Sequence, residues 1–209
     1  MAGIHDYGLY VLACLLLNVT PGQDTFYILG RSIGQGRRIG VASALGVAAG
    51  TVVHALAAAL GLSAVIATSA TAFTLIKWAG AAYLVYLGVR TLVTARAAVA
   101  VPATSGRADA RLAFRQGMLT NVLNPKVALF FLAFLPQFLV PGTDAPVPAL
   151  LLLGFTFVAT GTVWVVLLAV ASAAIGGALA RRPGVHAWLL RAMGALFVFL
   201  GVRLLATQR

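Results

Sequence analysis

The sequence Asn-Val-Thr-Pro-Gly-Gln-Asp at residues 18–24 interrupts the first hydrophobic segment of this chain, and Asn-Val-Leu-Asn-Pro-Lys at residues 121–126 interrupts a later one. Proline lacks a backbone N–H donor and prevents an uninterrupted helix. In hydrocarbon, such a break is tolerated only where the freed polar groups face protein or a water-filled cavity. A pair of broken helices, one in each half of a small membrane protein, indicates a transporter binding site near the middle of the bilayer.

The composition is that of an integral membrane protein. Of the 209 residues, 61% are hydrophobic and only 9% are charged, whereas a soluble domain carries roughly 25% charged residues. The formal net charge is +11, but no basic stripe carries interleaved aromatic side chains, so we expect no nucleic-acid binding. The single cysteine, Cys14, excludes an intrachain disulfide and a paired-cysteine redox site, and we expect it to pack in the interior.

Six apolar segments are long enough to cross a bilayer core of about 30 Å, which requires about 20 residues per helix. They are residues 7–33 (broken at 20–23), 40–67, 73–93, 112–139 (broken at 122–125), 147–175 and 188–206. The sequence therefore predicts an all-α, six-span polytopic membrane helix bundle, in which the first and fourth helices are broken.

The basic residues alternate between the links that join these segments. They follow the first segment, surround the link between the third and fourth, and surround the link between the fifth and sixth; the two intervening links contain no Lys or Arg. By the positive-inside rule, the three basic links are cytoplasmic, so both termini are expected to face outward.

The chain divides into a first three-span repeat at residues 1–93, a cytoplasmic linker at 94–110 and a second three-span repeat at 111–209, within one membrane domain. The first and fourth segments share the Asn-then-Pro break, and the third and sixth both end in Leu-Gly-Val-Arg, at 87–90 and 200–203. An odd number of spans per half turns the second half upside down, which predicts two inverted repeats. Coincidence is the alternative, because Leu, Gly and Val are frequent in any membrane helix.

At the first break, the residues predict a helix that restarts inside the membrane. Thr20 and Gln23 have the spacing of a capping box, and Pro21 suits the first helical position. Gly22 allows a ligand or a second backbone to approach closely.

At the second break, Asn124 is the expected N-cap and Pro125 the expected first helical residue. Each restart aims free N–H groups and the positive end of a helix dipole into the interior, where they suit a carboxylate. The predicted substrate-binding set is therefore Asn18, Thr20, Pro21, Gly22, Gln23, Asp24, Asn121, Asn124, Pro125 and Lys126.

Three of the ionisable residues inside the expected spans are candidates for a functional role. Burying the carboxylate of Asp24 in the membrane costs free energy. The alternatives for Asp24 are that it binds a substrate ammonium group, carries a coupling proton, or merely complements the dipole of its own helix. Lys126 pairs with Asp24, neutralises a substrate carboxylate, or snorkels toward the interface. His54 is either a proton relay or a polar residue bonded to a neighbour. Asp24 and His54 are the candidates for proton coupling.

Two further groups have structural interpretations. Gly46 and Gly50 are spaced for close contact between helices. Phe130, Phe131 and Phe134 follow the second break; they wall a cavity, pack in the interior or face lipid.

In these elements the chain resembles the lysine exporter and homoserine–threonine exporter (LysE/RhtB) family of bacterial inner-membrane amino-acid exporters, over essentially its whole length. The matching elements are Thr-Pro-Gly-Gln-Asp at 20–24, Gly-Arg-Arg-Ile-Gly at 36–40, the glycine- and histidine-containing run at 46–54, Asn-Val-Leu-Asn-Pro-Lys at 121–126 and Phe-Leu-Pro-Gln-Phe at 134–138. The family's usual second proline is Gln23 here, which restores a backbone donor beside the break.

The resemblance implies export of an amino acid or a related metabolite, driven by the proton gradient or the membrane potential. It places the chain in the bacterial inner (plasma) membrane as a multi-pass protein, so that both termini would be periplasmic. The mechanism expected is alternating access: the two halves rock about the breaks while the solute carboxylate sits at a helix N-terminus and its amino group approaches Asp24.

Other functions stay open at this point. The closest are export of another small solute or of a metal ion by a related fold, and a channel-like membrane protein; a metal exporter would carry more intramembrane Asp, Glu, Cys or His. No enzyme motif such as Gly-x-Ser-x-Gly or His-Glu-x-x-His occurs, so we expect no catalytic site. We expect no cofactor and no bound metal; the expected partners are the solute and the lipid bilayer, and a homodimer is one open arrangement.

Overall fold

The computed structural model describes residues 3–68, 108–140, 142–143 and 146–175, with scattered residues between 71 and 93 and between 191 and 202. Its elements are α1 (Tyr7–Val19), α2 (Gln23–Gln35), α3 (Arg37–Thr68), α5 (Ala110–Val122), α6 (Pro125–Phe134), the 3-10 helix η1 (Leu135–Phe138) and α7 (Pro146–Ile175). These ranges contain no strand beyond an isolated bridge between Ile4 and Leu139. The all-α prediction is therefore confirmed for the part of the chain that the structure describes.

Several expectations lie outside the described residues. They are most of the third and sixth segments (73–93 and 188–206), the linker up to residue 107, and both Leu-Gly-Val-Arg sequences, apart from isolated helical positions. The six-span count and the inverted repeat thus stay predictions.

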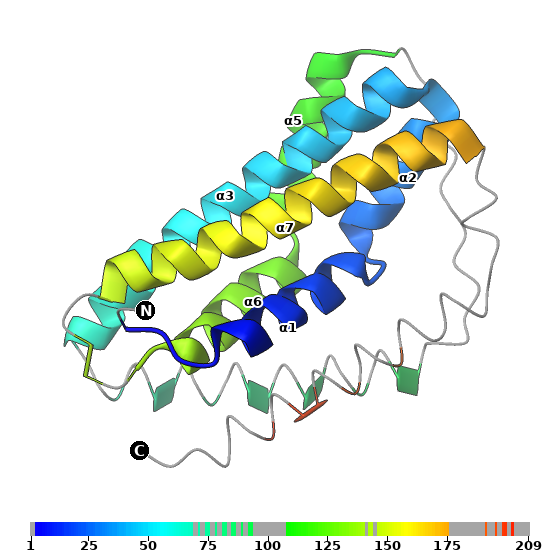
Figure 1. Cartoon of the computed structure of the whole chain (residues 1–209). Coiled ribbons are helices and arrows are strands. Elements are labelled where there is room, and N and C mark those ends of the chain that lie inside the picture. Colours follow the sequence, from blue (N-terminus) through cyan, green and yellow to red (C-terminus); the bar gives the residue numbers. More distant parts are fainter. Residues whose placement is uncertain are drawn as a thin grey trace.

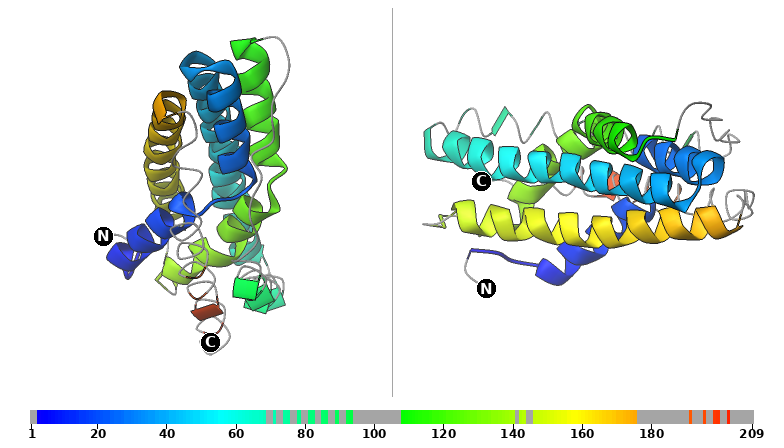
Figure 2. Two further views of the ribbon diagram at one scale, coloured as in Figure 1. Left: turned by 90° about the vertical axis from the view of Figure 1, so that its right-hand side faces the viewer. Right: turned by 90° about the horizontal axis from the view of Figure 1, so that it is seen from above.

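Helices α3 and α7 form the frame of the bundle. They lie side by side and run in opposite directions, which Figures 1 and 2 show from three sides. Each is long and apolar enough to cross a membrane, over Arg37–Leu62 and Pro146–Ala173. A third candidate span is the pair formed by α5 and α6 with η1, which bends by 50° at the second break, whereas α1 is a shorter apolar helix.

Close contact between α3 and α5 depends on glycine. A Cβ atom added to Gly46 would overlap the Phe114 carbonyl, and one added to Gly50 would lie 2.8 Å from the Met118 carbonyl oxygen. The two backbones therefore touch where these glycines face α5, and the close packing predicted from their spacing is confirmed.

An aromatic core surrounds the second half of α6. Phe130, Phe131 and Phe134 are each at most 1% exposed, and the ring centroids of Phe130 and Phe134 lie 4.6 Å apart. Tyr10 packs against Phe134 and its hydroxyl donates to the Leu153 carbonyl at 2.7 Å. The packing interpretation of the three phenylalanines is confirmed. Cys14, which is free, is buried in the same core, as expected.

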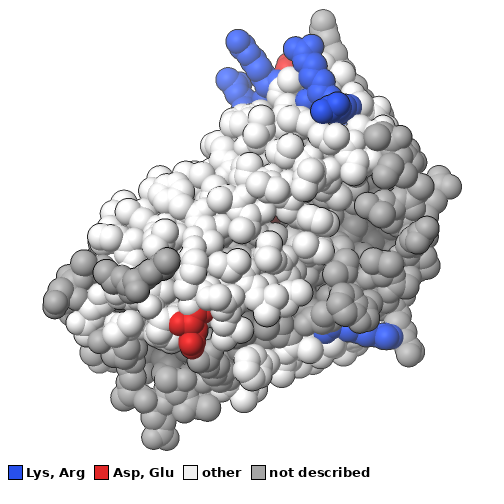
Figure 3. Space-filling view, in the orientation of Figure 1, with Lys and Arg blue, Asp and Glu red and all other residues white. Residues whose placement is uncertain are grey.

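Positive charge collects at one end of the molecule. In Figure 3, Lys and Arg side chains gather at the end where α3 and α5 begin, with one further group at another edge of this face. The exposed residues at these helix starts are Arg37, Arg38, Arg111 and Arg115, and we call this the basic end. The N-terminal segment lies at the opposite end, where the Val140 amide donates to the Gly3 carbonyl at 2.9 Å.

Candidate functional site

The first break separates α1 from α2 over residues 20–22. The Thr20 hydroxyl donates to the Leu16 carbonyl at 2.6 Å, so Thr20 closes the end of α1. Helix α2 begins at Gln23 with Gly22 as its N-cap and no side-chain cap. The predicted capping box is therefore wrong, because the threonine hydroxyl bonds back to the carbonyl four residues earlier instead of forward. Pro21 lies between the helices rather than in the first helical position.

The second break follows the prediction. Helix α5 ends at Val122 and α6 begins at Pro125. The Asn124 side-chain oxygen accepts from the Lys126 amide at 3.0 Å, which makes Asn124 the N-cap of α6. This asparagine satisfies one of the free amides that every helix start exposes.

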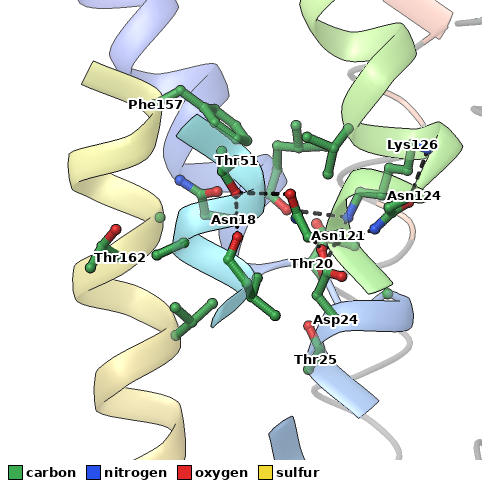
Figure 4. A pocket seen from close by; sticks show the side chains of 17 residues that line it. Asn18, Thr20, Asp24, Thr25, Thr51, Asn121, Asn124, Lys126, Phe157 and Thr162 are labelled. Carbon is green, nitrogen blue, oxygen red and sulfur yellow. Dashed lines mark hydrogen bonds between the residues drawn. The ribbon is translucent and has the colours of Figure 1, made fainter. Parts of the chain in front are cut away.

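The two breaks meet inside the bundle, where Asp24 binds both asparagines of the second break. One carboxylate oxygen, Asp24 Oδ2, accepts from Asn121 Nδ2 at 2.8 Å and from Asn124 Nδ2 at 2.9 Å. Figure 4 shows the three side chains pointing toward one another. The other carboxylate oxygen, Asp24 Oδ1, is buried and has no hydrogen-bond partner among the described residues. A buried carboxylate oxygen without a donor is costly, so this atom is suited to a ligand donor.

Lys126, at the second break, reaches the first break. Its ammonium group donates to the carbonyls of Leu17 and Thr20 at 3.4 and 3.2 Å, at the end of α1 where the helix dipole is negative. Within the described ranges, His5 and Asp6 are the only basic and acidic side chains that approach within 4.0 Å, so Lys126 forms no direct ion pair with Asp24. An ammonium group has three N–H donors, which leaves one of them available to a ligand.

A cavity of about 50 Å³ opens between the breaks. Since one water needs roughly 10–15 Å³ by this measure, the space suits a few water molecules and is too small for a whole amino acid. Seven predicted residues line it: Asn18, Thr20, Gly22, Asp24, Asn121, Asn124 and Lys126. Three others, Pro21, Gln23 and Pro125, do not, and the last two are exposed at the surface of their helices.

Beside the breaks, the cavity is also lined by Leu17, Thr25 and Val127. Helices α3 and α7 supply a second wall, which the sequence did not single out. Its residues are Val47, Ala48, Thr51, Phe157, Gly161, Thr162 and Val165. The only signal for them in the sequence is a hydroxyl or a glycine within an apolar helix, which is common in membrane segments. Because α3 and α7 are apolar on almost every face, periodicity does not separate the cavity side from the lipid side.

His54 lies behind the cavity and does not line it. Its Nε2 donates to the Asn121 carbonyl at 3.0 Å, and Thr51 Oγ1 approaches the Asn121 side-chain oxygen at 3.3 Å. Helix α3 thus holds Asn121 at both its backbone and its side chain. His54 is therefore hydrogen-bonded to a neighbouring residue, which is one of the two alternatives for it. A role of His54 in proton coupling remains a prediction.

The two arms of the first segment bind different neighbours. In α1, Asn18 Nδ2 donates to Thr160 Oγ1 of α7 at 3.1 Å. In α2, the Tyr27 hydroxyl donates to the Ala113 carbonyl of α5 at 2.6 Å, and Arg31 donates to Gln116 of the same helix. These side-chain hydrogen bonds link α1 to α7 and α2 to α5, while both α1 and α2 also pack against α7.

Several curated proteins are similar in sequence to this chain over most of its length. A "homoserine/homoserine lactone efflux protein" of Salmonella typhimurium is 32% identical over 200 residues, covering 96% of this chain and 95% of the relative. An "uncharacterized membrane protein" of Vibrio cholerae is 34% identical over 206 residues, covering 99% and 98%. A "leucine efflux protein" of Salmonella typhimurium is 24% identical over 137 residues, covering 66% and 65%. No solved structure matches the chain.

The family model described as "LysE type translocator" matches residues 15–208, which include both breaks and all the residues of the cavity wall. With that match and with relatives above 30% identity along nearly the whole chain, this protein belongs to the LysE type translocator family.

Proposed function

We propose that the protein is a secondary transporter that exports amino acids or related small metabolites across the bacterial inner membrane, with the cavity between the two breaks as its solute site. The observation that carries this proposal is the buried Asp24 Oδ1, which has no partner in the described part of the chain and belongs to a residue lining the cavity. The efflux proteins named above support the solute class.

The geometry suits both ends of a zwitterion. The ammonium group of the solute binds Asp24 Oδ1, while Oδ2 stays on the two asparagines. Its carboxylate binds the remaining N–H of Lys126 and the free amides at the start of α2. These two groups are adjacent, since a Cβ atom on Gly22 would lie 3.4 Å from Lys126 Nζ.

Movement at the breaks would give alternating access. The cavity of about 50 Å³ is smaller than the solute it would bind, so the helices around it must separate during transport. Residues 20–22 include Pro21 and lie outside both helices, so they are placed to act as a hinge between α1 and α2, whose side-chain hydrogen bonds go to α7 and α5 respectively. We propose that the basic end faces the cytoplasm, which makes the N-terminus periplasmic.

Asp24 is also the first candidate for the coupling proton. A proton on Asp24 would remove the charge that holds the solute ammonium, so proton entry from the periplasm would favour solute release there. His54, which reaches Asp24 only through Asn121, is the second candidate. The matched breaks support two inverted halves, at residues 1–93 and 111–209.

Counterflow in proteoliposomes tests the proposal. Vesicles containing the purified protein are loaded with unlabelled L-homoserine and diluted into a trace of the labelled compound, with L-leucine examined in parallel. A carrier concentrates the label inside, because the outward flow of unlabelled solute drives exchange. Label that only equilibrates would indicate a channel, and no uptake of either compound above protein-free vesicles would overturn the proposal.

A further inference from the structure

We infer that the wall formed by α3 and α7 is the subsite for the solute side chain, and that it selects small, uncharged side chains whose size is limited at Gly161. This inference rests on the proposed function, because it takes the cavity between the breaks as the solute site. In this arrangement the ammonium and carboxylate groups of the solute bind at the breaks, its side chain faces α3 and α7, and amino acids with charged side chains are excluded.

Charge is distributed unequally around the cavity. Among the described residues that line it, the only charged side chains are Asp24 and Lys126, and both lie at the breaks. The opposite wall is formed by Val47 and Thr51 of α3 and by Phe157, Thr162 and Val165 of α7, part of which Figure 4 shows. With the backbone groups of the solute held at the breaks, its side chain must point toward this wall.

An ionised side chain would have no partner there. Removing a charge from water is unfavourable unless an opposite charge or several hydrogen bonds replace the lost hydration. The wall supplies no opposite charge, only two hydroxyl acceptors for an ammonium or guanidinium group, and no free hydroxyl proton for a carboxylate, so we expect solutes of the lysine, arginine or glutamate type to be excluded. Uncharged side chains meet no such penalty.

The two threonines favour a solute hydroxyl over a purely aliphatic group. Thr162 Oγ1 donates its proton to the Val158 carbonyl at 2.7 Å, and Thr51 Oγ1 is 3.1 Å from the Val47 carbonyl. Both protons are therefore used inside the protein, while oxygen lone pairs remain to accept a hydrogen bond. A solute whose side chain carries an O–H donor fits this arrangement.

Gly161 limits the size of the subsite. A Cβ atom added there would lie 3.0 Å from Asn18 Oδ1 and 3.4 Å from Asn18 Nδ2. Asn18 itself is held by its bond to Thr160 at 3.1 Å, so it has little freedom to retreat. A methyl group at position 161 would therefore push the Asn18 amide into the cavity or occupy cavity volume itself.

Competition in the counterflow assay tests this inference. The probes are L-homoserine, L-threonine, L-leucine, L-lysine and L-glutamate, each added outside at equal concentration against labelled L-homoserine. We expect L-threonine to compete as well as unlabelled L-homoserine, and L-lysine and L-glutamate to compete at least tenfold more weakly. Competition by L-lysine or L-glutamate as strong as that by L-homoserine would overturn the inference and leave the proposed function standing.

Two variants test the wall directly. Gly161→Ala should weaken L-leucine about tenfold more than L-homoserine, since one methyl group in an apolar pocket has effects of about that size. Gly61→Ala is its control, because in the described part of the chain no atom outside the adjoining stretch of α3 lies within 4 Å of the added methyl group. Thr162→Val, which conserves volume, should reduce the preference for L-homoserine over L-leucine by about threefold to tenfold.

An equal loss for every solute in Gly161→Ala, together with an unchanged preference in Thr162→Val, would show that this wall only packs and would overturn the inference. If the wild-type protein exchanges none of the five compounds, the proposed function itself fails, and the inference fails with it.

Discussion

Replacing Asp24 with asparagine removes the charge of the candidate site with little change of shape. The new side-chain oxygen still accepts from the amides that now bind Oδ2 at 2.8 and 2.9 Å, so the contact between the breaks largely persists. What disappears is the carboxylate oxygen that has no protein partner within the described residues. In its place stands an NH2 group, which repels an ammonium group.

The expected cost follows from the surroundings of the carboxylate. Removing one partner of a buried charge pair costs about 2–5 kcal/mol. Asp24 is half-buried beside a cavity that has room for water, so we expect the lower part of that range, about 2–3 kcal/mol. Since 1.4 kcal/mol is a factor of about ten, the KM of Asp24→Asn for L-homoserine should rise about 30-fold to 150-fold.

The assay is homoserine counterflow into proteoliposomes that contain equal amounts of protein. Asp109→Asn is the matched control, because Asp109 caps α5 by accepting from the Arg111 amide at 2.8 Å and lies outside the cavity. Asparagine caps a helix about as well as aspartate, so this control should behave as wild type. A KM for Asp24→Asn within threefold of the wild-type value would refute the assignment of Asp24 to the solute ammonium.

Four further substitutions test the second break and the contact between α3 and α5. Asn124→Asp keeps a side-chain cap for α6 but removes the Nδ2 donor to Asp24 and places a second carboxylate beside it, so counterflow should be lost and the thermal unfolding midpoint should fall. Asn124→Ala loses the same donor and also the cap, which is worth about 1 kcal/mol or about 2–4 °C. Lys126→Met leaves the carbonyls at the end of α1 without their charged donor, and counterflow should fall about tenfold or more. Gly46→Ala should lower the midpoint through overpacking of about 1–3 kcal/mol, and a midpoint equal to that of Gly61→Ala would contradict the α3–α5 contact.

The positions of the two helix breaks could be predicted from proline and asparagine. Both breaks fall where the sequence places them, because proline cannot continue a helix and Asn124 is a good cap. The detail of the first break was predicted incorrectly. In an apolar environment the Thr20 hydroxyl has a nearby carbonyl four residues earlier, and that local bond competes successfully with the capping box.

Only the residues at the two breaks could be predicted as part of the candidate site. Its charged and amide groups are unusual in a membrane segment, so the sequence marks them. Its second wall consists of residues such as Phe157, Gly161 and Thr162, which occur throughout apolar helices and gain significance only from the direction in which they face. That direction is decided by the packing of α3 against α7 and by the Gly46 contact with α5, and neither can be derived from local sequence.

The reciprocal bonding of the breaks has an evolutionary consequence. Asp24 depends on Asn121 and Asn124 at the second break, while Lys126 depends on the carbonyl end of α1 at the first. A single substitution at either break leaves a polar group at the other break without its hydrogen-bond partner. Substitutions at these positions should therefore be tolerated mainly in pairs. Positions 24, 121 and 124 should therefore covary when many family members are aligned, and their double mutants should be markedly non-additive.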